Sequence, residues 1–158
     1  MTLRNAVLAL ALAGAAATAQ AGVKASAVNT SNLIILNRGP VLVPLNAAGA
    51  TTLSFSLASA GKKILTFSSE CAVNAPQGIY GDYLDLDILV NGVVVTPTVD
   101  ADPFCSANGT GFFDGYIRTS ITIPIQVKSG INTVQIKASG SANVTGMWLG
   151  ASALVIYD

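Results

Sequence analysis

The sequence predicts an all-β protein: two antiparallel sheets packed as a β-sandwich, with a jelly roll as the first choice and an immunoglobulin-like arrangement as the second. Three observations predict this class. Val, Ile, Leu and Thr gather in strand-length runs that are broken by Gly, Asn, Pro and Ser. No segment repeats apolar residues with the period of a helix. The runs follow one another without crossover helices, which favours antiparallel pairing.

The first 21 residues have the pattern of a cleavable export signal. Arg4 supplies positive charge, an apolar run covers Ala6–Ala17, and small residues stand at the cleavage positions in Ala19–Ala21. The apolar core is shorter than the roughly 20 residues that a membrane span needs. We therefore expect residues 1–21 to be removed. Residues 22–158 should form one secreted domain, extracellular or periplasmic, with no membrane span.

The charge of the mature chain argues against one class of partner. Without Arg4, seven Lys and Arg face eight Asp and Glu, so the expected net charge is −1. Nucleic acid is therefore not an expected partner, because no basic field is present to hold phosphates. Only 10% of the residues are charged, and a surface so poor in charge offers little resistance to self-association.

Nine runs predict strands, and a weaker tenth covers Asn143–Trp148. The dipeptide Asn91-Gly92 between two β-branched runs is typical of a type I′ hairpin. Pro124 marks its run as an edge strand or a bulge, since proline cannot donate to a ladder. The nine runs are Asn32–Leu36, Val41–Leu45, Thr51–Leu57, Lys63–Ser69, Tyr83–Val90, Val93–Thr96, Tyr116–Gln126, Asn132–Ala138 and Ser152–Tyr157.

The chain has two cysteines, Cys71 and Cys105, and no histidine. An even cysteine count in an exported chain predicts a disulfide between them. The alternative is a pair of buried free thiols. The absence of histidine excludes a Ser-His-Asp triad and leaves too few ligands for a zinc site.

Acidic residues gather around one predicted strand start, at Asp82, Asp85 and Asp87. Asp85 and Asp87 share a face because a strand has a period of two. Three carboxylates at one edge would suit a calcium ion, and the alternative is a solvated sheet face. A glycosidase would need Glu70 to face Asp85 or Asp87 across a bond, and nothing in the spacing singles these residues out. We predict no catalytic residue and, calcium apart, no cofactor.

Aromatic residues concentrate in two loop-rich segments, while Trp148 stands apart near the C-terminus. Aromatic faces beside Asp, Asn and amide groups suit a sugar, whose apolar face stacks while its hydroxyls form hydrogen bonds. The alternative is that these aromatics pack the core and the loops. The predicted ligand surface comprises Tyr80, Tyr83, Phe104, Phe112, Phe113 and Tyr116.

Six segments spread over the mature chain form a recognisable pattern: Phe67–Val73, Leu84–Gly92, Pro97-Thr98, Phe104-Cys105, Gly130–Ile136 and Ala153–Tyr157. With these segments, most of the mature chain resembles small secreted bacterial β-sandwich proteins of unknown function. Such proteins are similar in strand layout to jelly-roll carbohydrate-binding modules. The resemblance implies a sandwich with one disulfide and no established activity, and it carries over no binding residue.

Three classes of function remain, of which an enzyme is the least favoured. The first is a secreted, non-catalytic module that binds a carbohydrate or a cell-surface polymer. The second is an assembly subunit of an extracellular matrix or filament, whose partners are copies of itself. In that case the apolar segment Asn32–Leu36 would complete a neighbour's sheet.

Overall fold

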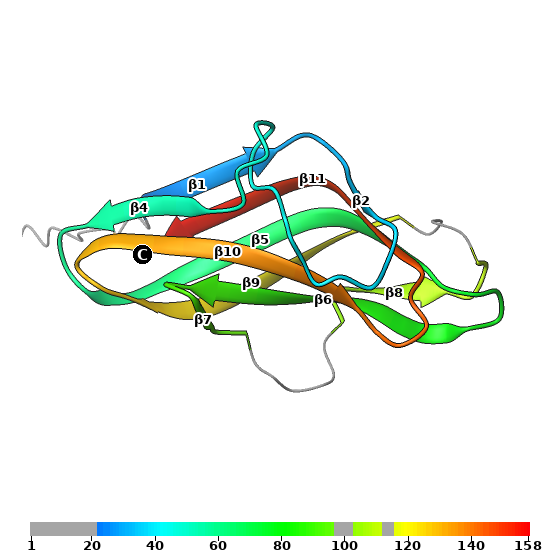
Figure 1. The fold of residues 1–158 in the computed structure, drawn as a ribbon. Helices are drawn as coiled ribbons and strands as arrows, with labels where there is room; N and C mark the ends of the chain where they lie inside the picture. The colour runs from blue at the N-terminus through cyan, green and yellow to red at the C-terminus, as the bar shows by residue number, and fades with distance from the viewer. Residues whose placement is uncertain (1–21, 97–102, 112–115) are drawn as a thin grey trace, which may run out of the picture.

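The computed structural model describes residues 22–96, 103–111 and 116–158. Within these ranges the chain forms strands joined by turns and loops, and none of the described residues lies in a helix. This part of the chain therefore contains no helix that is long and apolar enough to cross a membrane. The strands form two facing layers (Figure 1).

The first layer, named here the β5 sheet, has β9 at one end and β1 at the other. Its strand order is β1-β11-β5-β9, with β2 also paired to β11, and every pair is antiparallel. Pro124 therefore lies in an edge strand, as predicted. The strands are β1 (Val23–Asn29), β2 (Leu33–Ile35), β5 (Gly61–Asn74), β9 (Ile117–Val127) and β11 (Gly146–Tyr157).

The second layer, named the β6 sheet, is built around β10 and β6. Its order is β3-β10-β6-β7, with β4 paired to β10 and β8 paired to β6. These pairs are also antiparallel. The strands are β3 (Val41–Leu42), β4 (Leu53–Leu57), β6 (Tyr80–Val90), β7 (Val93–Val94), β8 (Cys105–Asn108) and β10 (Gly130–Gly140).

The connections between the layers are those of a jelly roll. From β4 to β6, and again from β8 to β11, each strand is followed by one in the opposite sheet. The orders β1-β11-β5-β9 and β4-β10-β6-β8 correspond to two interleaved Greek keys. The predicted two-sheet antiparallel sandwich is therefore confirmed, in its jelly-roll form.

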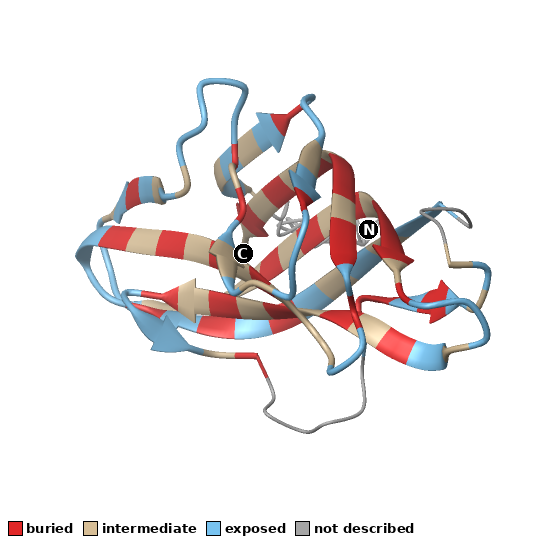
Figure 2. Ribbon diagram, turned by 45° about the vertical axis from the view of Figure 1, so that its right-hand side comes forward, coloured by how far each residue is buried: buried red, intermediate tan, exposed pale blue. Residues whose placement is uncertain are grey.

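Local sequence signals explain several elements directly. Asn91 and Gly92 both have positive φ, 52° and 81°, and they connect Val90 to its partner Val93 in the predicted hairpin. Buried and exposed residues alternate along the strands, so that each sheet buries one face against the other (Figure 2). The period-two patterning of apolar residues thus determines which face of each strand enters the core.

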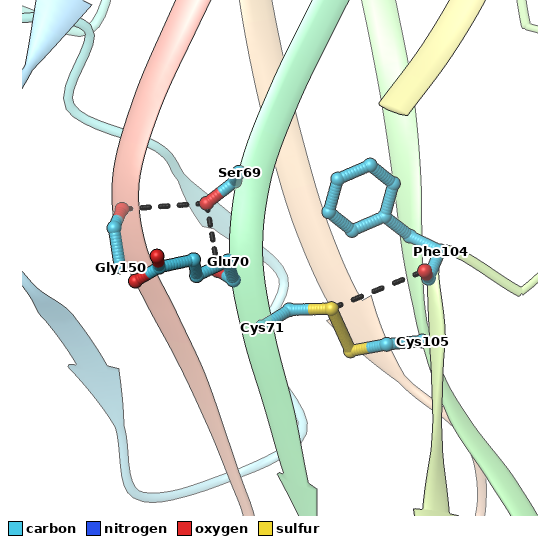
Figure 3. The surroundings of a disulfide bond; sticks show 6 residues. All are labelled: Ser69, Glu70, Cys71, Phe104, Cys105 and Gly150. Carbon is cyan, nitrogen blue, oxygen red and sulfur yellow. Dashed lines mark hydrogen bonds between the residues drawn. A yellow bond between two sulfur atoms is a disulfide. The ribbon is translucent and has the colours of Figure 1, made fainter. Parts of the chain in front are cut away.

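The core lies between the two sheets and is closed by the disulfide. Cys71 of β5 bonds Cys105 of β8, with their Cα atoms 6.4 Å apart, so the bond joins the two layers (Figure 3). The predicted pairing is confirmed. The largest fully buried side chains around it are Phe67, Leu65, Leu84, Ile88, Ile125, Ile136, Met147, Leu149, Leu154, Ile156, Val43 and Val73.

The structure adds two strands to those predicted and joins two predicted runs into one strand. β1 and β8 have weak β-forming sequences and are held by pairing to β11 and β6. The predicted runs Asn143–Trp148 and Ser152–Tyr157 belong largely to one strand, β11. The segment Asn32–Leu36 contains β2, which pairs with β11 of its own chain, so this segment already has a partner strand.

Candidate functional site

The predicted loop surface of six aromatic residues is not assembled as a unit among the described residues. Phe112 and Phe113 lie outside the described residues. Phe104 is buried, and its ring centroid is 5.8 Å from that of Phe67 inside the core. Phe104 is therefore corrected to a core residue. This agrees with the alternative interpretation, in which these aromatic residues pack the core and the loops.

Tyr80 and Tyr83 belong to the β6 sheet. Tyr80 is 76% exposed, and its ring lies over Gly109, where a Cβ would come within 2.4 Å of the ring. Tyr83 is half-buried, stands opposite Ser106 of β8 and donates its backbone N–H to Ser141 Oγ. These two tyrosines therefore occupy a different sheet from Tyr116, the sixth predicted residue.

Tyr116 forms an aromatic pair with Trp148 on the outer face of the β5 sheet. Their ring centroids are 4.7 Å apart, and the ring planes meet at 74°. Trp148 of β11 stands opposite Ala72 of β5, and Ile117, which follows Tyr116, stands opposite Cys71. The two rings thus come from strands on either side of β5. Ala72 faces outward between those strands, yet only 2% of it is exposed.

A carboxylate and a guanidinium adjoin this aromatic pair. Glu70 of β5 stands directly opposite Arg118 of β9, and Arg118 Nη2 donates to Glu70 Oε1 at 2.9 Å. Both side chains remain substantially exposed. A pocket of about 470 Å³ is lined by Glu70, Tyr116, Ile117, Arg118 and Trp148. That volume lies within the usual range of small-molecule sites.

A glycine in a β-bulge sets the position of the indole. The register of β11 against β5 shifts between Leu149 and Ser152, so β11 carries extra residues opposite Glu70. A Cβ added to Gly150 would lie 2.5 Å from Trp148 Cη2 and 3.0 Å from Glu70 Oε2. Gly150 therefore leaves the space that the indole and the carboxylate share.

The strand beneath the pocket is anchored at two points. Ser69 Oγ lies within hydrogen-bonding distance of two carbonyl oxygens, 2.8 Å from Glu70 O and 3.3 Å from Gly150 O (Figure 3). Cys71, the next residue but one, is fixed to β8 by the disulfide. These contacts hold Glu70 and the bulge in place from the buried side of the sheet.

Hydroxyl groups continue the outer face away from the pocket. Ser68 stands opposite Ser120, and Thr66 stands opposite Thr122, with the two threonine Oγ1 atoms 2.9 Å apart. Tyr157 Oη lies 3.3 Å from Thr66 Oγ1. An extended polar ligand that leaves the pocket along β5 and β9 would therefore meet hydroxyls able to donate and accept hydrogen bonds.

The predicted calcium-binding trio is not brought together. Asp82 precedes Leu84 by two residues and shares its inward direction, whereas Asp85 and Asp87 face outward. Asp87 also pairs with Lys137 of β10. Among the described residues, no group of three His, Cys, Asp or Glu side chains is close enough to hold a metal ion. Strand alternation is the physical reason for this correction.

Asp82 instead belongs to a buried hydrogen-bonding arrangement at the end of the β6 sheet. Its Oδ1 accepts from Ser141 Oγ at 2.6 Å and from the Asn143 N–H at 3.3 Å. These bonds, the one from Ser141 first, lower the pKa of Asp82 below its ordinary value, while burial opposes them. Asp82 therefore ties β6 to the turn before β11.

The carboxylates considered for glycosidase chemistry lie on opposite sides of the molecule. Glu70 faces outward from the β5 sheet, and Asp85 and Asp87 face outward from the β6 sheet. Because the core separates them, Glu70 cannot act with either aspartate across one glycosidic bond. Trp148, Glu70 and Arg118, which the sequence did not place together, form the site with Tyr116.

Comparison with known proteins gives resemblances of architecture. The chain matches no protein-family model and no curated protein. A family 35 carbohydrate-binding module from Clostridium thermocellum matches with TM-score 0.38 and 16% identity, covering 82% of this chain and 97% of that one. The module CBM6cm-2 of Cellvibrio mixtus lichenase 5A, solved with cellotriose, matches with TM-score 0.37 and 12% identity, covering 87% and 98%.

A third similar solved structure is not described as a carbohydrate-binding module. Dimeric latent PorU from Porphyromonas gingivalis matches with TM-score 0.41 and 12% identity, covering 89% of this chain and 14% of that one. The expected resemblance to carbohydrate-binding modules is thus found among solved structures. At these identities and TM-scores it carries no argument about a ligand, so the functional argument rests on the site itself.

Proposed function

We propose that this protein is a non-catalytic module that binds a carbohydrate on the outer face of the β5 sheet. Tyr116 and Trp148 stack against the apolar C–H face of a sugar ring, while Glu70 and Arg118 bond its hydroxyls. The observation that carries the proposal is the shared pocket of these four side chains. It joins one apolar wall to convergent polar groups, the usual composition of a small-molecule site.

The exposure of Tyr116 supports a role in ligand binding rather than in the core. Tyr116 is 57% exposed on a sheet whose other face is already packed against the core. Exposed apolar surface rimmed by polar groups is characteristic of binding sites, because water hydrates such surface unfavourably. The 74° angle gives the pair the form of a corner, which suits one glycan chain better than the flat surface of a crystalline polymer.

The absence of catalysis is part of the proposal and has its own support. Glu70 is the only glutamate in the sequence, and its Oε1 is bonded to Arg118. Among the residues that the structure describes, the pocket lining contains no second carboxylate to serve as acid or base. These described residues thus supply contacts for a sugar without a pair of groups that would cleave it.

A glycan array followed by calorimetric titration tests this proposal. Tyr116→Ala should weaken binding by about 1–3 kcal/mol, roughly 5- to 150-fold, because it removes one stacking face. Tyr80→Ala is the matched control, since it removes a tyrosine that is even more exposed from the other sheet. If Tyr80→Ala abolished binding while Tyr116→Ala retained it, the proposal would be wrong, and the ligand would bind on the surface that carries Tyr80.

Self-assembly stays as the competing function, and one measurement separates the two. The segment Asn32–Leu36, which motivated strand exchange, already pairs with β11 of its own chain. We therefore expect the mature protein to elute as a monomer in size-exclusion chromatography at micromolar concentration. A large or polymeric species that persists in 0.5 M or so of salt, where surface ion pairs are screened, would favour assembly.

A further inference from the structure

The charges of the pocket are paired with each other. Arg118 Nη2 and Glu70 Oε1 are 2.9 Å apart, and among the described residues these are the two charged members of the lining. Three further ion pairs lie elsewhere: Lys24 and Lys63 pair with Asp158, and Lys137 pairs with Asp87 on the β6 sheet. The described lining therefore offers a ligand hydrogen-bonding groups with no net charge.

A neutral sugar can use both members of this pair without separating them. A guanidinium has five N–H donors, and a carboxylate has about four acceptor positions. The hydrogen bond from Arg118 Nη2 to Glu70 Oε1 leaves donors on Arg118 and acceptors on Glu70 for sugar hydroxyl groups, which both donate and accept. The ion pair can therefore stay intact while the sugar binds.

An acidic sugar would bring a second negative charge into the same pocket. Its carboxylate or sulfate would have to compete with Glu70 for Arg118, because Glu70 Oε1 already accepts a hydrogen bond from Arg118 Nη2 at 2.9 Å. The carboxylate Oε2 lies beside Gly150 and Trp148, at the β-bulge that Ser69 holds from the buried side. Two anions would then face each other across one guanidinium, and like charges at such distances repel.

We infer, on the basis of the proposed function, that the pocket selects uncharged glycans over acidic ones and that Glu70 is the residue that excludes anions. The inference concerns the class of ligand. It assigns Glu70 the role of a specificity determinant and Arg118 that of a hydrogen-bond donor rather than a free cation.

The test compares matched neutral and acidic oligosaccharides by titration at low and moderate ionic strength. Xylo- and cello-oligosaccharides serve as neutral probes, and oligogalacturonates of equal length serve as acidic ones. Wild-type protein should prefer the neutral class by about tenfold or more. Glu70→Gln keeps the size and an acceptor but frees the charge of Arg118, so it should gain about tenfold for the acidic class, and salt should reduce this gain.

Asp87→Asn is the matched control, because it removes one negative charge from the opposite sheet and changes the net charge equally. It should leave both affinities unchanged. Equal or tighter binding of the acidic class by wild-type protein, or no gain for Glu70→Gln, would overturn this inference while leaving glycan binding intact. Binding of neither class by wild-type protein would overturn the proposed function, and the inference with it.

Discussion

Tyr116 meets Trp148 edge-on across β5, with 4.7 Å between ring centroids and 74° between ring planes. One ring precedes β9 and the other belongs to β11, so the contact exists only when both strands pair with β5. The pair therefore depends on the sheet order of the jelly roll. Changes to the strand order or to the local register should therefore alter the position of the two rings, and the nearest such feature is the β-bulge at Gly150.

Gly150→Ala should displace the indole and weaken glycan binding by about tenfold. The added Cβ would stand 2.5 Å from Trp148 Cη2, and the indole end is the group free to move. Stability should fall by less than about 1 kcal/mol, because the clash is with side-chain ends at the surface. A shifted tryptophan emission maximum with only a small decrease in the denaturant midpoint would support this result. Unchanged emission and unchanged affinity would contradict it.

Removal of the disulfide should destabilise the domain without changing its strands. The bond spans a sequence separation of 34 residues, for which the chain-entropy model gives about 3–4 kcal/mol. The double variant Cys71→Ala/Cys105→Ala should lose that amount in denaturant unfolding, with β-rich circular dichroism retained. Thiol titration of denatured, unreduced wild-type protein should find no free thiol. Equal unfolding midpoints for the two proteins would contradict the prediction.

Asp82 should make the folded state sensitive to acid. Its pKa is lowered in the folded protein, chiefly by the Ser141 hydroxyl, so its contribution is present above the unfolded value of about 3.9. That contribution is lost as the pH falls through the lowered folded value. Asp82→Asn should therefore flatten the decline in stability below about pH 4, measured by denaturant midpoints.

Asp158 needs a separate control in that experiment. Its pKa is also lowered, by Lys24 first and Lys63 next, and it lies at the surface. Asp158→Asn removes this second acid-sensitive group, so the double variant isolates the part due to Asp82. If Asp82→Asn leaves the pH profile unchanged in both backgrounds, the buried hydrogen bonds of Asp82 do not contribute to acid sensitivity.

We predict that the protein is exported and that cleavage leaves Gly22 as its first residue. The small residues of Ala19–Ala21 precede this position, and β1 begins at Val23. Intact mass of secreted material should match residues 22–158 with two hydrogens missing for the disulfide. A mass that includes the apolar run Ala6–Ala17 would show that the leader is retained.

The fold could be predicted largely from local patterns, because alternation and turn chemistry are recorded in neighbouring residues. The Asn91-Gly92 hairpin and the edge position of Pro124 are examples. β8 was not predicted because Cys105–Asn108 has weak β propensity and gains its stability from pairing with β6.

The candidate site could be predicted only in part. Tyr116 was identified, but its partnership with Trp148 depends on a sheet order that joins residues distant in sequence. Phe104 could not be told from an exposed loop aromatic, since its neighbours in sequence are polar and its packing partner is Phe67. Asp82 was misplaced although period-two alternation already placed it on the face opposite Asp85.

The most direct test uses the fluorescence of Trp148, the only tryptophan in the sequence. Emission of the folded protein should change in a saturable way as a neutral oligosaccharide chosen from the glycan array is added. The midpoint should match the calorimetric dissociation constant, and Tyr116→Ala should move it about 5- to 150-fold higher. A glycan that binds by calorimetry and leaves Trp148 emission unchanged would place the binding site elsewhere and contradict the account.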